Sequence, residues 1–146
     1  MCGIVGLFLK DPSLEPMLGD MLTDMLVTMT DRGPDSAGIA IYGAETAGNA
    51  KLTVQSDTPD EDFAKLDTDL RKLVKGKVTI RVTDTHAVLE LQSDQVGEAR
   101  AALKDIRPNV RVMSHGESLE IFKEVGLPKD VAERFNIRSM SGTHGI

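Results

Sequence analysis

The residue of this chain best suited to covalent chemistry is a lone cysteine. Cys2 follows Met1 and is the only cysteine among 146 residues. A small side chain after the initiator methionine allows its removal, which would make Cys2 the first residue. The free α-amine, with an ordinary pKa of about 7.7–8.0, could then take the thiol proton directly or through a water. Because thiolates attack carbonyl carbons, this position predicts acyl transfer; the alternative is a small buried side chain without reactivity.

A polar turn is the second candidate. Residues 30–36 (TDRGPDS) end a predicted helix with a Gly-Pro break. The apolar run Ala37–Tyr42 that follows predicts a buried strand. Strand, helix, turn and strand thus form the first unit of the chain.

The two motifs together resemble a known family. The start MCGIVG (residues 1–6) and the segment DRGPDSAG (residues 31–38) closely resemble the class II glutamine amidotransferases, which are N-terminal nucleophile hydrolases. The resemblance implies that Cys2 attacks the side-chain amide of glutamine and that ammonia leaves. Water then resolves the γ-glutamyl thioester to glutamate, and the ammonia passes to a synthase partner.

The resemblance also assigns supporting residues around the nucleophile. In the family the Arg-Gly-Pro-Asp turn braces the active site beside the first strand, so Gly3, Arg32 and Gly33 are expected as substrate-binding or supporting residues. Asp35 and Ser36 are expected there as turn and strand-entry residues. Arg32 has an alternative role in a surface ion pair, which is worth under about 1 kcal/mol when exposed.

The histidines give no metal site. His86, His115 and His144 lack the spacing of a one-turn ligand pair, so no metal is expected. His144 lies in the glycine-rich loop 142–145, which the resemblance brings toward the active site; the alternative is an ordinary loop histidine. This loop lacks the Lys-Ser/Thr ending of a phosphate-binding loop, so nucleotide binding is not expected.

Within the family, the arrangement looks most like the amidotransferase subunit related to the glutamate synthase amide-transfer domain. There the flavin lies on separate partner chains, so we expect a flavin-dependent, glutamate-synthase-like partner and no cofactor on this chain. The family continues past Gly145-Ile146 with an arginine that grips the substrate carboxylate and an Asn-Gly oxyanion hole, both absent from these 146 residues. We therefore expect an N-terminal portion with negligible glutaminase activity by itself.

The elements that must hold the cysteine and the turn lie in residues 1–50, the expected N-terminal part of the amidotransferase domain. Residues 3–9 form an apolar run that predicts a strand buried on both faces. Apolar residues then recur at three- and four-residue steps over 14–29, which predicts a helix capped by Ser13.

Residues 51–115 predict a self-contained α+β insert. The patterns indicate a strand over Lys51–Ser56, a helix over 60–74 and a β-hairpin formed by Lys77–Thr83 and His86–Gln92. A second helix over Asp94–Ile106 and a last strand over Asn109–Ser114 follow. The order strand-helix-strand-strand-helix-strand is the split pattern of ferredoxin-like modules. An alternative to the enzyme is therefore a non-catalytic ferredoxin-like module that binds a ligand or docks a partner.

Residues 116–146 complete the expected organisation as a helical return segment ending in a loop. Helices are predicted over Leu119–Val125 and Lys129–Phe135, and a loop from residue 139 onward. The patterns predict an α+β fold class, and the resemblance implies a partial αββα-type N-terminal nucleophile hydrolase fold with the ferredoxin-like insert. Because half of such a fold leaves apolar sheet surface exposed, we expect an oligomer or a complex.

Composition limits the classes of partner. Seventeen Lys plus Arg against 23 Asp plus Glu give a net charge of −6, which repels phosphate backbones and anionic lipids. Aromatic residues make up 3% and Trp is absent, so surfaces for base stacking are few. Neither nucleic acid nor membrane is an expected partner. The apolar start has no basic leader and falls short of a membrane span, so a cytoplasmic protein is expected.

Overall fold

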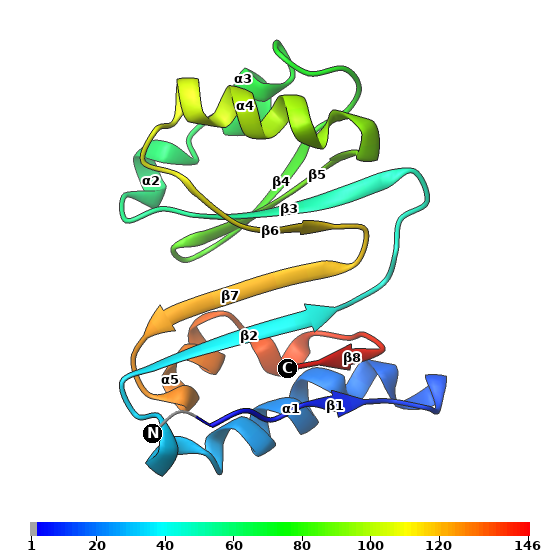
Figure 1. Ribbon diagram of the computed structural model, residues 1–146, viewed down its shortest axis with the longest axis vertical. Helices are drawn as coiled ribbons and strands as arrows, with labels where there is room; N and C mark the ends of the chain where they lie inside the picture. The colour runs from blue at the N-terminus through cyan, green and yellow to red at the C-terminus, as the bar shows by residue number, and fades with distance from the viewer. Residues whose placement is uncertain (1–2) are drawn as a thin grey trace. The chain divides into compact units, whose positions relative to one another are not determined.

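The computed structural model describes residues 3–146, which form two units (Figure 1). Unit 1 takes in the chain up to Ala44 together with Ile121–Ile146, and unit 2 is Glu45–Glu120. Cys2, the predicted nucleophile, lies outside the described residues. None of the helices among the described residues combines the length and the hydropathy needed to cross a bilayer.

A four-stranded sheet in the order β1-β8-β2-β7 forms the framework of unit 1. β1 (Leu7–Phe8) and β2 (Ser36–Tyr42) both run antiparallel to the short β8 (His144–Gly145) between them. β7 (Leu119–Val125) lies on the other side of β2. Because β1 and β2 run in the same direction, the segments that lead into them lie at the same edge of the sheet.

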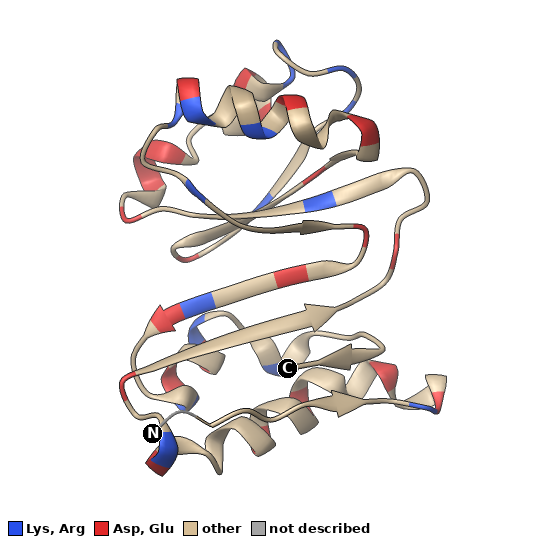
Figure 2. Cartoon of the chain, viewed as in Figure 1, with Lys and Arg blue, Asp and Glu red and all other residues tan. Residues whose placement is uncertain are grey.

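Within the described part of unit 1, helices pack on one face of this sheet (Figure 1). Along β2 the side chains alternate between buried and more exposed, and the strand carries no charged residue (Figure 2). Only Leu7–Phe8 form β1, and Ile4 and Phe8 expose 84% and 66% of their surface. The prediction that 3–9 is a strand buried on both faces is therefore wrong. The strand predicted over Ala37–Tyr42 is present as β2, with alternate side chains buried.

The predicted first helix is present in two parts. A 3₁₀ segment, Pro12–Met17, leads into α1 (Leu18–Val27). The cap is Asp11, whose carboxylate accepts a hydrogen bond from the Ser13 N–H at 2.9 Å. Its hydrogen bonds with Ser13 lower the pKa of Asp11. The prediction of Ser13 as the cap is wrong, because Asp11 provides the side-chain acceptor two residues earlier.

Helix α1 approaches the backbone of the C-terminal segment closely at Gly19. The Gly19 N–H donates to the carbonyl of Met140 at 2.9 Å. A Cβ at Gly19 would lie 2.0 Å from the carbonyl oxygen of Ile137, in the 3₁₀ segment Ile137–Ser139. Only glycine therefore permits this packing.

The C-terminal segment differs from its prediction. The helix predicted over Leu119–Val125 is wrong, because these residues form β7, with Phe122 buried and its two neighbours less so. The helix predicted over Lys129–Phe135 is confirmed as α5 (Pro128–Arg134). The predicted terminal loop contains β8, which pairs with two neighbouring strands.

Unit 2 has its own four-stranded sheet, in the order β4-β5-β3-β6. All neighbouring strands in it are antiparallel. Its elements follow the predicted order of strands and helices, with these bounds: β3 (Asn49–Gln55), α2 (Pro59–Asp62), α3 (Leu66–Leu70), β4 (Thr79–Thr83), β5 (His86–Gln92), α4 (Val96–Ile106) and β6 (Arg111–Gly116). The helix predicted over 60–74 is divided, because Lys65 adopts a left-handed conformation with φ of 56° between α2 and α3.

Helices α3 and α4 cover one face of this sheet (Figure 1). The core between them is apolar, and its strand and helix side chains include Leu52, Val54, Phe63, Leu66, Leu70, Leu89, Leu91 and Leu103. Unit 2 therefore buries a hydrophobic core of its own.

An ion pair between the helices gives unit 2 a predicted pH dependence. Hydrogen bonds from Lys72 and Arg107, each at 3.0 Å, lower the pKa of Asp69. Because the pKa of Asp69 is lower in the folded state than in the unfolded state, its ionised carboxylate stabilises the fold at pH values above the unfolded-state pKa of about 3.9. This contribution to stability disappears as the pH falls through the folded-state pKa. We expect Asp69→Asn to lower the unfolding free energy at neutral pH and to converge with the wild type in strong acid.

Urea unfolding followed by circular dichroism across this pH range measures the effect. Glu117→Gln, at an exposed position in the loop before β7, is the control and should change stability little at any pH. A constant difference between Asp69→Asn and wild type at all pH values would contradict the prediction.

Candidate active site

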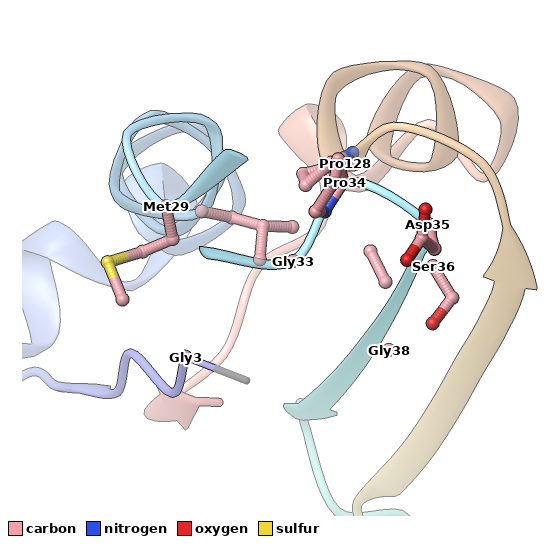
Figure 3. Close-up of a pocket in the computed structure, with 10 residues that line it drawn as sticks. Gly3, Met29, Gly33, Pro34, Asp35, Ser36, Gly38 and Pro128 are labelled. Atoms are coloured by element: carbon pink, nitrogen blue, oxygen red, sulfur yellow. The ribbon is translucent and has the colours of Figure 1, made fainter. Parts of the chain in front are cut away.

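A pocket of about 250 Å³ lies in unit 1 beside the start of β2 (Figure 3). It is lined by Gly3, by Leu26 in α1 and Met29 just after it, by the segment 33–38, and by Pro128 at the start of α5. The common direction of β1 and β2 explains why the N-terminal segment and the turn before β2 meet here. The pocket therefore adjoins the residue that directly follows Cys2.

The turn before β2 is held at both ends by backbone hydrogen bonds. At its start, the Gly33 N–H donates to the carbonyl of Thr30 at 3.1 Å and closes the short 3₁₀ segment Thr30–Arg32. At its end, the Gly126 N–H donates to the carbonyl of Asp35 at 2.9 Å. These bonds fix the path of the backbone along the pocket.

Two polar side chains lie on the pocket wall. Asp35 and Ser36 are both exposed, and the close-up shows them projecting near the start of β2 (Figure 3). The carboxylate can accept hydrogen bonds from an ammonium or amide group, and the hydroxyl can donate or accept. The wall thus combines a carboxylate and a hydroxyl with apolar surface from Leu26, Met29 and Pro128, which suits a small polar ligand.

The N-terminal segment passes close to the end of α1. A Cβ at Gly3 would lie 2.5 Å from Cε of Met29 and 3.4 Å from Cβ of Arg32. Arg32 therefore neighbours Gly3, although it does not line the pocket. Of the supporting residues predicted from the sequence, Gly3, Gly33, Asp35 and Ser36 line one pocket, and Arg32 packs beside it.

His144 is the predicted residue that the fold places elsewhere. Its ring stacks on Tyr42 with centroids 4.0 Å apart, and its Nδ1 lies 2.9 Å from the hydroxyl of Thr143. Tyr42 ends β2 and Ser36 begins it, a separation of about 20 Å along an extended strand. His144 therefore belongs to an aromatic cluster at the opposite end of β2 from the pocket.

Three pocket residues lie outside the two sequence motifs, namely Leu26, Met29 and Pro128. Leu26 and Met29 belong to the apolar stripe of α1, whose periodicity predicts burial and carries no signal for a ligand. Pro128 is distant in sequence and reaches the wall through α5. Among residues 3–146, no three His, Cys, Asp or Glu side chains are grouped so that they could hold a metal ion.

Two curated proteins match the full length of this chain, whereas no family model matches it. The chain is 58% identical over 147 residues to the "Glutamine amidotransferase-like protein GlxB" of Rhizobium meliloti (strain 1021), of which the match covers 48%. It is 30% identical over 154 residues to the "Putative glutamine amidotransferase" of Methanothermobacter thermautotrophicus, of which the match covers 50%. Both names refer to glutamine amidotransferases.

These matches support a glutamine amidotransferase family for the chain. Each alignment covers 100% of this chain, so it includes Cys2, the turn and every residue that lines the pocket. The chain spans about half the length of these two relatives.

Proposed function

We propose that this chain carries part of the active site of a class II glutamine amidotransferase, which hydrolyses glutamine to glutamate and ammonia. The nucleophile is Cys2 after removal of Met1, and the base is its own α-amine. The observation that carries the proposal is the pocket of about 250 Å³ that Gly3 and the segment 33–38 line together. It places a ligand-sized space next to the residue bonded to Cys2.

The reaction needs no cofactor on this chain. The thiol proton moves to the α-amine, and Sγ forms a bond to the carbonyl carbon of the glutamine amide. As the tetrahedral centre collapses, the C–N bond breaks and ammonia leaves with that proton. Water then adds to the thioester, the C–S bond breaks, and glutamate leaves while the thiol is restored.

In this proposal the nucleophile lies among these 146 residues, and other groups needed for catalysis do not. The family resemblance assigns substrate-carboxylate binding and the oxyanion hole to residues that are not among these 146, and the relatives are about twice as long. Oxyanion donors contribute about 10²–10³ in rate, so these residues alone should show negligible glutaminase activity. The proposal includes the N-terminal nucleophile hydrolase fold, a reducing compartment that keeps the thiol free, and a synthase partner that consumes the ammonia.

Mass spectrometry and labelling of the cysteine test this proposal. Intact mass should show the loss of one methionine. A glutamine-directed diazo-ketone should then label the chain once, faster than it labels a free peptide of residues 2–6, because the pocket orients the reagent. Cys2→Ser removes the only cysteine and should abolish labelling.

A pocket variant and a distant variant sharpen the test. A Cβ at Gly33 would meet no atom within 4 Å, so Gly33→Leu should occupy the pocket without a clash and slow labelling about tenfold, a barrier change of about 1.4 kcal/mol. His144→Ala, far along β2, should leave the rate unchanged. Retention of Met1, or a rate equal to that of the free peptide, would refute the proposal.

A further inference from the structure

Unit 2 contains a second pocket that the proposed reaction does not use. It has a volume of about 190 Å³ and is lined by five polar residues, Asn49, Lys77, Thr79, Glu90 and Gln92. Drug-sized ligands occupy sites of about 300–1,000 Å³, so this space accepts only a small molecule.

The strand register explains why these polar side chains meet. Asn49 lies opposite Gln92 across β3 and β5, and Thr79 lies opposite Glu90 across β4 and β5. Glu90 and Gln92 are two residues apart on β5 and so share one face of the sheet. Lys77 lies two residues before Thr79, the first residue of β4, and both line the same pocket. This face is opposite to the one on which Leu89 and Leu91 join the core.

Neighbouring groups restrain the pocket walls. The Asn49 side-chain amide donates to Oε1 of Glu90 at 3.4 Å. The Gln92 amide packs against Gly76, where a Cβ would lie 2.8 Å from Oε1 of Gln92 and where φ is +86°. Two of the polar groups are therefore positioned before any ligand arrives.

The charges on this face leave one cation and one anion for a ligand. Lys51 lies opposite Glu90 across β3 and β5, and Arg81 lies two residues after Thr79 on β4. Both bind the buried carboxylate of Glu120, at 3.0 and 2.5 Å. The pocket itself contributes the ammonium of Lys77 and the carboxylate of Glu90. Two side-chain amides and a hydroxyl complete its wall.

We infer that this pocket binds a free α-amino acid. Lys77 receives the carboxylate, Glu90 receives the ammonium, and the amides of Asn49 and Gln92 contact the side chain. Opposite charges on one small wall favour a zwitterion over a purely anionic or cationic ligand, since a ligand of one sign leaves one wall charge facing a like charge. This site lies in unit 2 and uses none of the residues proposed for the reaction at Cys2.

Binding of L-glutamine to the full chain, followed by titration calorimetry, tests the inference. The Cys2→Ser variant is used throughout so that no turnover occurs. We expect saturable binding that weakens about tenfold or more in Glu90→Gln and in Lys77→Gln. Lys104→Gln and Glu98→Gln, at exposed positions of α4, are the matched controls and should bind as the parent does.

Charge-deleted ligands test the assignment of the two contacts. N-acetyl-L-glutamine lacks the ammonium and 4-aminobutanamide lacks the carboxylate, so each should bind more weakly than L-glutamine. Absence of saturable binding at millimolar L-glutamine would overturn the inference. Binding that persists in Glu90→Gln but disappears in Gly33→Leu would also overturn it, while supporting the pocket beside Cys2.

Discussion

Gly19→Ala is expected to destabilise unit 1 by about 3 kcal/mol or more. The added Cβ would lie 2.0 Å from the carbonyl oxygen of Ile137 and 2.7 Å from that of Met140. Overpacking in a tight core typically costs about 1–3 kcal/mol, and backbone atoms cannot move aside as a flexible side chain can. Separation of α1 from the C-terminal segment would also break the Gly19–Met140 hydrogen bond.

The chain offers a built-in reporter for this measurement. Tyr42 is the only tyrosine, Trp is absent, and Tyr42 lies in β2 of unit 1. Its fluorescence during urea unfolding therefore reports on unit 1. Gly33→Ala is the matched control: it also lies in unit 1, a Cβ there meets no atom within 4 Å, and its substitution should change stability by less than about 0.5 kcal/mol. Equal behaviour of the two variants would contradict the packing described for Gly19.

Phe122→Ala is expected to have the second large effect, a loss of about 3–5 kcal/mol. Phe122 is completely buried on β7, and its ring centroid lies 5.3 Å from that of Phe135. Truncation removes this contact and leaves a cavity under the sheet. The same tyrosine signal applies, because β7 neighbours β2.

Val125→Ala on the same strand distinguishes β7 from the helix predicted there. In a helix, residues three apart share a face, so 122 and 125 would be similarly sensitive. In a strand, positions an odd number apart point to opposite faces, and Val125 exposes 77% of its surface. We expect Val125→Ala to change stability by less than about 0.5 kcal/mol. A large loss in both variants would favour the helix.

Features that depend on neighbours in sequence could be predicted. The hairpin between Lys77–Thr83 and His86–Gln92 is present, with Thr83 paired to His86 around Asp84-Thr85. Asp84 has φ of 54°, a conformation that Asp tolerates better than most residues. The turn before β2 was found in the same way, because Gly-Pro ends a helix through backbone chemistry alone.

Some residues of the candidate site could be predicted from the sequence, and others could not. Cys2 was selected from its residue type and position, and Arg32, Gly33, Asp35 and Ser36 were selected from the family resemblance that the two motifs carry. The position of His144 could not be obtained in this way, since it depends on the pairing of β8 with β1 and β2. Leu26 and Pro128 become pocket residues only because the end of α1 and the start of α5 lie near the start of β2.

Local chemistry was thus determined by the sequence itself: a thiol at the second residue, a polar turn that ends a helix at Gly-Pro, and the succession of strands and helices in unit 2. Tertiary structure alone decided that 119–125 is a strand, that β1 is largely exposed, and that Gly3 meets the turn. The physical reason is that propensities and caps act over a few residues, whereas burial and strand partners depend on contacts between distant segments. An amphipathic segment such as 119–125 satisfies more than one local pattern, and the neighbouring β2 selects the strand.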